Sequence, residues 1–330
     1  MIEVRNLTKR YGSTVAVDGI SFEIPRGEVI GFLGPNGAGK TTTMRILTCY
    51  LPADAGEARV AGFDVFSESI EVRRRIGYLP ESAPVYSEMG IVEYLRFVSE
   101  IRGIPSSEQQ RRIDDVVMRV GLGPMIQKDI GQLSKGFRQR VGLAATLIHE
   151  PEVLILDEPT TGLDPNQIIE IRELIREIGR EKTVILSTHI LPEVEATCSR
   201  VLIINSGRIV ASGTPEELTR AAAGEVRCRV SLRASPAEVE PALRAIEGVV
   251  GVRGLEPVKE RTTRYEVHAQ NNNEIEDAIF RLAVRHDWTM TELHTETRSL
   301  EQVFTQLTLG ERPTLESSES MESPQSEVVV

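Results

Sequence analysis

The sequence has little of what would place a protein in a membrane, outside the cell or on nucleic acid. Its three cysteines, Cys49, Cys198 and Cys228, are too few and too far apart to build a disulfide framework or a zinc site. No uncharged apolar stretch reaches about 18 residues, so no segment is expected to span a membrane. Acidic residues outnumber basic ones by 49 to 38, which argues against a nucleic-acid partner.

These absences favour a protein of the reducing cytoplasm, where unpaired cysteines are ordinary. The start of the chain carries Glu3, Arg5, Lys9 and Arg10 without an adjoining apolar run, which is not typical of a secretory signal peptide. The composition is that of a globular protein, with 40% hydrophobic and 26% charged residues, and 330 residues suit about two domains. Any role at a membrane is therefore expected to depend on a partner.

The first part of the chain alternates short apolar runs with helical patterns. The runs cover 29–33, 153–156, 184–186 and 201–204. Nearly continuous apolar runs of this length are typical of parallel strands that are buried on both faces. We therefore predict a layered α/β domain over residues 1–222.

The second part has a different rhythm, beginning after a change of composition near 220–225. Strands are predicted at 226–232, 249–255, 262–269 and 288–294, and capping boxes at 235–238 and 273–276 open two helices. The order β-α-β-β-α-β is the split-βαβ pattern, and an amphipathic helix with Leu300, Val303, Phe304 and Leu307 follows. We predict a small α+β domain over 226–308 and a disordered acidic tail over 311–330.

A phosphate-binding motif follows the first apolar run. It consists of Gly34, Pro35, Asn36, Gly37, Ala38, Gly39, Lys40 and Thr41. Its glycines let successive backbone N–H groups face one centre, and the helix that begins at its end adds a favourable dipole. Lys40 can reach the phosphates, the Thr41 hydroxyl can hold Mg²⁺, and Thr42 continues the cradle. The alternative, an ordinary glycine turn before a helix, does not explain the strand–loop–helix context.

Two adjacent acids end the run at 153–156. Ligands of α/β sheets bind at the carboxyl ends of the strands, where Asp157 and Glu158 would lie. Asp157 suits Mg²⁺ through water, and Glu158 can polarise an attacking water. Taken alone, the pair could be an exposed acidic turn before Pro159; together with the phosphate loop it indicates nucleotide hydrolysis.

Three further motifs distinguish this chain among phosphate-loop proteins. They are Leu-Ser-Lys-Gly-Phe-Arg-Gln-Arg at 133–140, Asp-Glu-Pro-Thr-Thr-Gly-Leu-Asp at 157–164, and Leu-Ser-Thr-His at 186–189. The ordered set resembles the ATP-binding subunit of ABC transporters over roughly residues 2–220. The resemblance implies a mixed sheet with a helical subdomain at about 85–150, and an ATPase that uses ATP and Mg²⁺.

The resemblance also implies roles for individual residues. Tyr11 is expected to stack on adenine, and Ser134 and Gly136 to contact the γ-phosphate of ATP on a partner subunit. Asp164 matches the acid of the D-loop, and His189 matches the switch histidine. The implied catalytic residues are Glu158, His189, Lys40 and Glu81, and the implied metal ligands are Thr41, Asp157 and Glu81.

Three positions depart from the common pattern of that family. Glu81 stands where glutamine is usual, Lys135 where glycine is usual, and Phe137 where glutamine is usual. A carboxylate at position 81 brings negative charge toward phosphate. The same departures, with Leu-Glu-Gln-Val-Phe at 300–304, resemble the gliding-motility or multidrug type of subunit, which pairs with separate permease chains and carries a C-terminal accessory domain.

The resemblance therefore implies an exporter subunit that binds two ATP molecules in a head-to-tail pair of ATP-binding domains, as a homodimer or a heterodimer. It would act at the inner face of the cell membrane through a permease. The permease would contact the segment at 82–104, with Val85, Tyr86 and Met89 as the best candidates, although helical spacing also makes part of this segment plain core.

Two other functions are alternatives to this one. A soluble ABC-type ATPase that serves assembly or translation would need no permease, but translation-type members usually fuse two phosphate loops and this chain has one. A phosphate-loop kinase would leave 134–140 and His189 unexplained.

Overall fold

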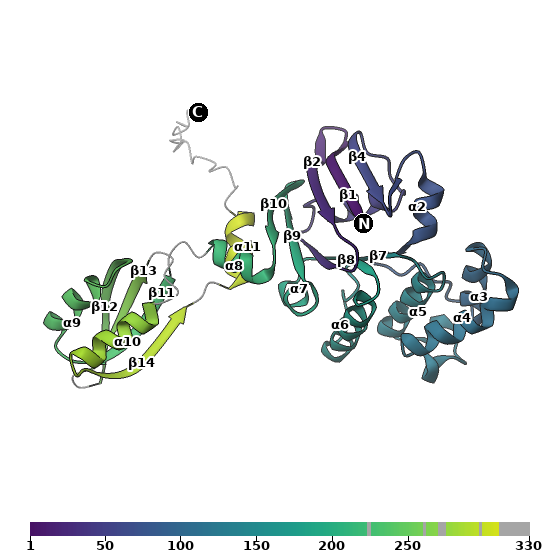
Figure 1. Cartoon of the computed structure of the whole chain (residues 1–330). Coiled ribbons are helices and arrows are strands. Elements are labelled where there is room, and N and C mark those ends of the chain that lie inside the picture. The colour runs from purple at the N-terminus through teal and green to yellow at the C-terminus, as the bar shows by residue number, and fades with distance from the viewer. Residues whose placement is uncertain (223–225, 260–261, 270–274, 297–298, 310–330) are drawn as a thin grey trace, which may run out of the picture.

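The computed structural model of the chain describes residues 1–222, 226–259, 262–269, 275–296 and 299–309. They form three sheets, two in the first part of the chain and one in the second (Figure 1). No helix among these residues is long and apolar enough to cross a bilayer. The predicted tail at 311–330 lies wholly outside these residues. The predicted capping box at 273–276 lies partly outside them.

A six-stranded sheet forms the centre of the first domain, in the order β10-β9-β3-β8-β7-β6. Its strands are β3 (Val29–Leu33), β6 (Ile76–Leu79), β7 (Val153–Asp157), β8 (Thr183–Thr188), β9 (Arg200–Asn205) and β10 (Arg208–Gly213). All neighbours pair in parallel except β9 and β10, which form an antiparallel hairpin. The four apolar runs of the sequence are therefore the four central and near-central strands, as predicted.

A second, antiparallel sheet has the order β2-β1-β4-β5. Its strands are β1 (Ile2–Tyr11), β2 (Thr14–Ile24), β4 (Ala55–Val60) and β5 (Phe63–Asp64), and the helices α1 (Lys40–Leu47) and α2 (Ser69–Arg75) accompany it. Alternate residues of β3 and β7, such as Phe32 and Ile155, bury their side chains in one core with this sheet and α1. The neighbouring residues Leu33 and Leu156 enter the core on the opposite face. The central sheet is thus buried on both faces.

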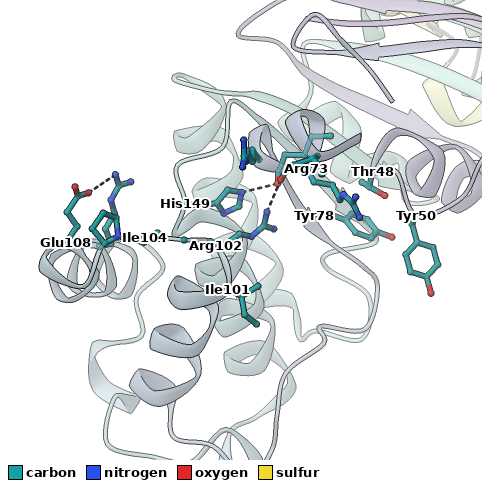
Figure 2. A pocket seen from close by; sticks show the side chains of 15 residues that line it. Thr48, Tyr50, Arg73, Tyr78, Ile101, Arg102, Ile104, Glu108 and His149 are labelled. Carbon is teal, nitrogen blue, oxygen red and sulfur yellow. Dashed lines mark hydrogen bonds and ion pairs between the residues drawn. The ribbon is translucent and has the colours of Figure 1, made fainter. Parts of the chain in front are cut away.

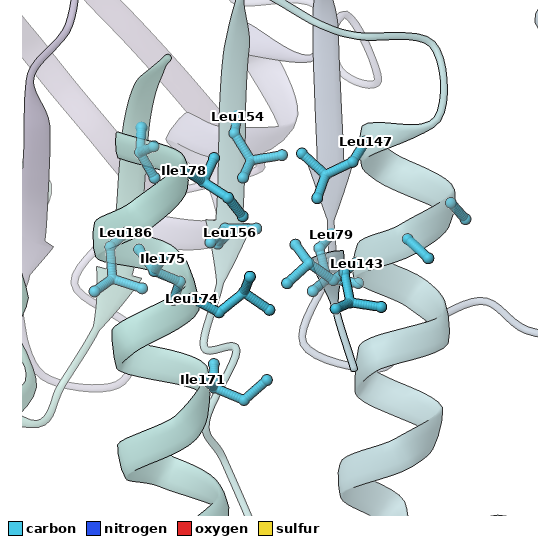
Figure 3. Packing of buried hydrophobic residues seen from close by; sticks show 14 of the residues in the cluster. Leu79, Leu143, Leu147, Leu154, Leu156, Ile171, Leu174, Ile175, Ile178 and Leu186 are labelled. Atoms are coloured by element: carbon cyan, nitrogen blue, oxygen red, sulfur yellow. The ribbon is translucent and has the colours of Figure 1, made fainter. Parts of the chain in front are cut away.

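Helices cover that opposite face. They are α3 (Ile91–Ile101), α4 (Ser106–Arg119), α5 (Lys135–Leu147), α6 (Pro165–Gly179) and α7 (Leu191–Thr197), with short 3₁₀ turns at Gly123–Met125 and Ile130–Gln132. Figure 3 shows α5 and α6 facing each other across Leu154 and Leu156 of β7. The helical segment within 85–150 and the mixed sheet together confirm the predicted fold class of this domain.

The second part of the chain has its own sheet and core. Its elements are β11 (Val226–Arg233), α9 (Pro236–Arg244), β12 (Val249–Lys259), β13 (Thr262–Ala269), α10 (Ile275–Arg285) and β14 (Thr289–Glu296). The strand order β12-β13-β11-β14 is wholly antiparallel, as the split-βαβ pattern requires. Tyr265, Val267 and Ile279 are buried in a core separate from the first domain. Ser235 precedes α9 as predicted, but its side chain makes no capping hydrogen bond.

The last helix, α11 (Leu300–Leu309), lies beside α8 (Pro215–Ala222) and near β9 of the first domain (Figure 1). Leu300 and Val303 are buried in the core that also contains α5 and α6. The buried Asn205 amide, at the end of β9, donates to the carbonyl oxygens of Leu307 and Thr308 at 3.5 and 3.4 Å. The chain therefore returns to the first domain after the second, and the predicted range 226–308 contains a helix that packs on the first domain.

We expect Leu300→Ala to destabilise the first domain rather than the second. The substitution removes a side chain that is 2% exposed, which costs about 2–5 kcal/mol of free energy of unfolding when the site cannot collapse. If the first domain binds nucleotide as the sequence predicts, the thermal transition that added nucleotide raises should move to lower temperature in this variant. Glu301→Ala, which changes an exposed neighbour, should alter the temperature of this transition little. A downward shift confined to a transition that nucleotide does not affect would instead assign α11 to the second domain.

Candidate nucleotide site

The phosphate loop joins β3 to α1, as the sequence predicts. Gly39 precedes the helix with a φ of +108°, and a Cβ there would lie 2.4 Å from the carbonyl oxygen of Ala16. A Cβ on Gly34 would lie 2.4 Å from the carbonyl oxygen of Ile204. Glycine is needed at the first position for its backbone conformation and at both for space. The loop is thus held against β2 and β9 by close backbone contact.

Lys40, the first residue of α1, is 5% exposed. Its Nζ donates to the carbonyl oxygens of Gly34 and Pro35 at 2.8 and 3.2 Å, and lies 3.5 Å from Oε1 of Glu158. A buried ammonium group needs such partners, because desolvation of an unpaired charge is costly. The contacts fix the amine at the mouth of the loop, next to the predicted acidic pair.

Glu158 follows β7 in an unusual backbone conformation. Its φ is +49°, which is uncommon for a residue other than glycine and costs on the order of 1–3 kcal/mol. Its N–H donates to the carbonyl oxygen of Ser187 at 2.9 Å, and its side chain is only 7% exposed. The strained backbone turns this carboxylate toward Lys40. Asp157, one residue earlier, is 1% exposed and lies level with Ser187 of β8.

His189 follows β8 and faces Glu158. The His189 Nδ1 lies 3.0 and 2.9 Å from the two carboxylate oxygens of Glu158. Since Lys40 approaches the same carboxylate, one acid joins the phosphate loop to the end of β8. Lys40 and His189, which stand far apart in the sequence, therefore both contact Glu158.

A cavity of about 360 Å³ is lined by these residues. Its lining consists of Ala16, Asn36, Gly37, Gly39, Lys40, Thr41, Thr42, Glu81, Glu158, Thr161 and His189. Ala16 and Thr161 were not among the predicted site residues. Ala16 lies on β2 and carries no chemical signal in the sequence, whereas Thr161 sits within a quoted motif and its hydroxyl donates to Glu158 Oε2 at 3.4 Å.

Tyr11, predicted to stack on adenine, does not line this cavity. It ends β1 and is 47% exposed, and the Lys9 amine lies 5.8 Å from the centre of its ring. An exposed aromatic ring is accessible to a nucleobase, so the role of Tyr11 stays a prediction.

The signature residues lie apart from the cavity, at the start of α5. The Ser134 hydroxyl caps this helix by accepting from the N–H of Phe137 at 3.4 Å. A Cβ on Gly136 would lie 2.4 Å from the side-chain oxygen of Gln167, which follows Asp164, the N-cap of α6. Ser134, Gly136 and Asp164 are thus grouped at the adjoining ends of two helices, and none of them lines the nucleotide cavity of the same chain.

The residues predicted to hold Mg²⁺ fit a hard, partly hydrated cation. Oδ1 of Asp157 is buried and has no hydrogen-bond partner among the described residues. Thr41 and Glu81 line the adjoining cavity. No group of three or more acidic, histidine or cysteine residues that could hold a metal occurs in the described part of the chain. Mg²⁺ is commonly held by one or two protein oxygens together with phosphate and water.

A loop of backbone N–H groups, a lysine and strand-end acids at the edge of a mostly parallel sheet define a phosphate-loop nucleoside triphosphatase. Residues 17–161 match the protein family described as ABC transporter. The chain is 32% identical over 311 residues to the linearmycin resistance ATP-binding protein LnrL of Bacillus subtilis, spanning 93% of this chain and 98% of that protein. The chain belongs to the ATP-binding proteins of the ABC transporter family, and it is an ATPase.

Other relatives and solved structures agree with this assignment. The chain is 38% identical over 258 residues to the daunorubicin/doxorubicin resistance ATP-binding protein DrrA of Streptomyces peucetius, covering 78% of each. The structure of cbiO1 from Clostridium perfringens, part of the ABC transporter complex cbiONQ, is 31% identical with a TM-score of 0.61. It covers 67% of this chain and 94% of that one, which supports the fold of the first domain.

Glu158→Gln should leave ATP binding intact and lower turnover about 100-fold or more, because the amide cannot accept a proton from water. Nucleotide titration and steady-state phosphate release measure the two effects separately. The exposed Glu173→Gln on α6 provides a matched control and should hydrolyse ATP normally. Turnover by Glu158→Gln within a few fold of the unchanged protein would exclude Glu158 as the general base.

Glu81→Gln tests whether the charge at this position serves the metal. If Glu81 ligates Mg²⁺, the variant should need more Mg²⁺ for half-maximal activity while its maximal rate survives, since a neutral amide is a weaker ligand for this cation. Hydrolysis measured across a Mg²⁺ titration gives the comparison, with the exposed Glu88→Gln as control. An unchanged Mg²⁺ requirement would show that Glu81 does not bind the metal.

Proposed function

We propose that this chain is the ATP-hydrolysing subunit of an ABC exporter and drives a separate permease. The observation that carries the proposal is the contact of Glu158 with both Lys40 and His189 beside the phosphate loop. In this arrangement, Lys40 binds the phosphates, Glu158 orients and deprotonates the attacking water, and His189 positions that carboxylate. Bound Mg²⁺, held by Thr41 and Asp157 with Glu81 nearby, would neutralise phosphate charge.

A head-to-tail dimer completes the proposed site. Ser134 caps the N-terminus of α5, where free N–H groups and the helix dipole favour an anion. The cavity of the same chain does not include this residue, so the anion would be the γ-phosphate of ATP bound by the partner. Two ATP molecules would then lie between two subunits, and hydrolysis would separate them.

The relatives favour export of an antibiotic-class compound. One is named for linearmycin resistance and another for daunorubicin and doxorubicin resistance. The first is matched over nearly its whole length, including the part beyond the first domain. The compound itself would be bound by the permease, and this chain would supply the energy from the inner face of the membrane.

A second, larger cavity is our candidate for the permease contact. It measures about 880 Å³ and lies between the α1–β4 connection, α2 and β6 on one side and the α3–α4 connection on the other (Figure 2). Tyr50, Ile70 and Ile101 line it and are 73, 62 and 68% exposed. By comparison, Val85 and Met89, predicted to meet the permease, pack against the core, whereas Tyr86 is 53% exposed.

The charges of this groove indicate what it would bind. Arg112 is paired with Glu108 and Arg74 with Glu71, but neither Arg73 nor Arg102 has a carboxylate partner within the described ranges. Burial and the nearby Arg102 lower the pKa of His149 to about 4, so this residue adds no charge at neutral pH. A groove with exposed apolar side chains and two uncompensated arginines suits a short permease helix that carries apolar side chains and a carboxylate.

Arg73→Glu should weaken binding of the chain to its permease without changing its affinity for ATP. The reversed charge would repel an acidic segment, so the yield of membrane protein that co-purifies from detergent extracts should fall at least several-fold. ATP binding by the purified chain should be unchanged, because Arg73 lies outside the nucleotide cavity. Arg180→Glu, an exposed reversal at the end of α6, is the matched control.

The identity of the co-purified chain, determined by mass spectrometry, tests the function itself. A polytopic membrane protein supports the exporter. A soluble assembly or ribosomal partner in its place would favour the ABC-type ATPase that has no permease.

A further inference from the structure

Glu193 is a buried acid that the site described above does not use. It lies on α7, four residues after His189, and is 1% exposed. Each of its carboxylate oxygens accepts a hydrogen bond from a buried threonine. The Thr160 hydroxyl donates to Oε1, and the Thr188 hydroxyl donates to Oε2 at 2.8 Å. Both hydrogen bonds come from neutral hydroxyl groups, although burying a carboxylate among neutral groups is costly.

The two threonines belong to the two segments that carry the proposed catalytic groups. Thr160 comes two residues after Glu158, in the turn that follows the left-handed backbone of this residue. Thr188 immediately precedes His189, and its carbonyl oxygen accepts from the N–H of Gly34 at 3.4 Å. Glu193 therefore links the turn of the acidic pair to the end of β8, and β8 in turn to the start of the phosphate loop.

We propose that Glu193 is a positioning residue that sets the distance between Glu158 and His189. A backbone with φ near +49°, as at Glu158, persists only where the surrounding structure holds it. Glu193 fixes the following turn through its hydrogen bond with Thr160. The same carboxylate holds the strand end from which His189 reaches Glu158 at 2.9 Å. Release of either threonine would let the general base move relative to water and phosphate. This inference rests on the proposed hydrolytic role of Glu158.

Glu193→Ala should lower kcat about 10- to 100-fold while the KM for ATP and the measured nucleotide affinity change less than about twofold. Lys40 and the loop glycines, which would bind ATP, do not contact Glu193, so binding should survive. A merely structural role would reduce the fraction of protein that binds nucleotide, and the rate per bound nucleotide would not change. Rates are therefore expressed per nucleotide-binding site. Glu193→Gln keeps one acceptor and should restore part of kcat.

Two controls lie on the same helix. Glu195→Ala removes an exposed acid, and Thr197→Val removes a buried hydroxyl that has no hydrogen-bond partner in the described structure. Both should leave kcat unchanged. If Glu193→Ala does not fold, the isosteric variants Thr160→Val and Thr188→Val carry the test. Each should lower kcat about 3- to 10-fold at unchanged affinity for ATP.

The outcomes separate this inference from the proposed function. If Glu158→Gln is inactive while Glu193→Ala and both threonine variants retain normal kcat, Glu193 has no positioning role and the proposed function stands. If Glu158→Gln itself hydrolyses ATP normally, the assignment of the general base fails and the inference fails with it. A loss of nucleotide affinity that parallels the loss of kcat in Glu193→Ala would also overturn the positioning role.

Discussion

Parallel pairing of β3 with β8 and of β8 with β7 is the constraint on which the site depends. The register sets Leu33 level with Thr188 and Asp157 level with Ser187, so three strands end at one edge of the sheet. The phosphate loop, the acidic pair and His189 each begin where one of these strands ends. Because every strand of this set is buried on both faces, its register cannot slip without moving an apolar row out of the core.

The site concentrates features that folding alone would not favour. A lysine and two acids are buried, the backbone of Glu158 is left-handed, and Asp157 keeps an unpartnered oxygen. Each of these costs free energy in the absence of a ligand. The surrounding core offsets the cost, since the helices α5 and α6 bury a dense apolar layer directly behind β7 (Figure 3). Strain and charge can therefore persist at the edge of a sheet that apolar cores cover on both faces.

Three separate surfaces of the first domain contact its central sheet. Nucleotide would contact the edge at β3 and β7, while the basic groove lies beside β6 and α2, and α11 contacts the end of β9. The hairpin after β9 donates from the N–H of Gly207 to the carbonyl oxygen of Ala38 within the phosphate loop, at 3.0 Å. The helix α11 therefore contacts the end of β9, next to the hairpin that bonds to the phosphate loop.

Much of this arrangement could be read from the sequence. Apolar runs marked the central strands, glycine spacing marked the loop, and the order of motifs indicated the family, because each of these signals is local in the chain. Tertiary structure alone decided that α11 packs on the first domain, since an amphipathic helix does not encode which core will bury it. It also decided that Tyr11 stays outside the cavity and that Ala16 lines it. No sequence pattern pointed to Glu193. Its proposed role depends on hydrogen bonds from Thr160 and Thr188, which come together at one carboxylate because β7 and β8 pair in parallel.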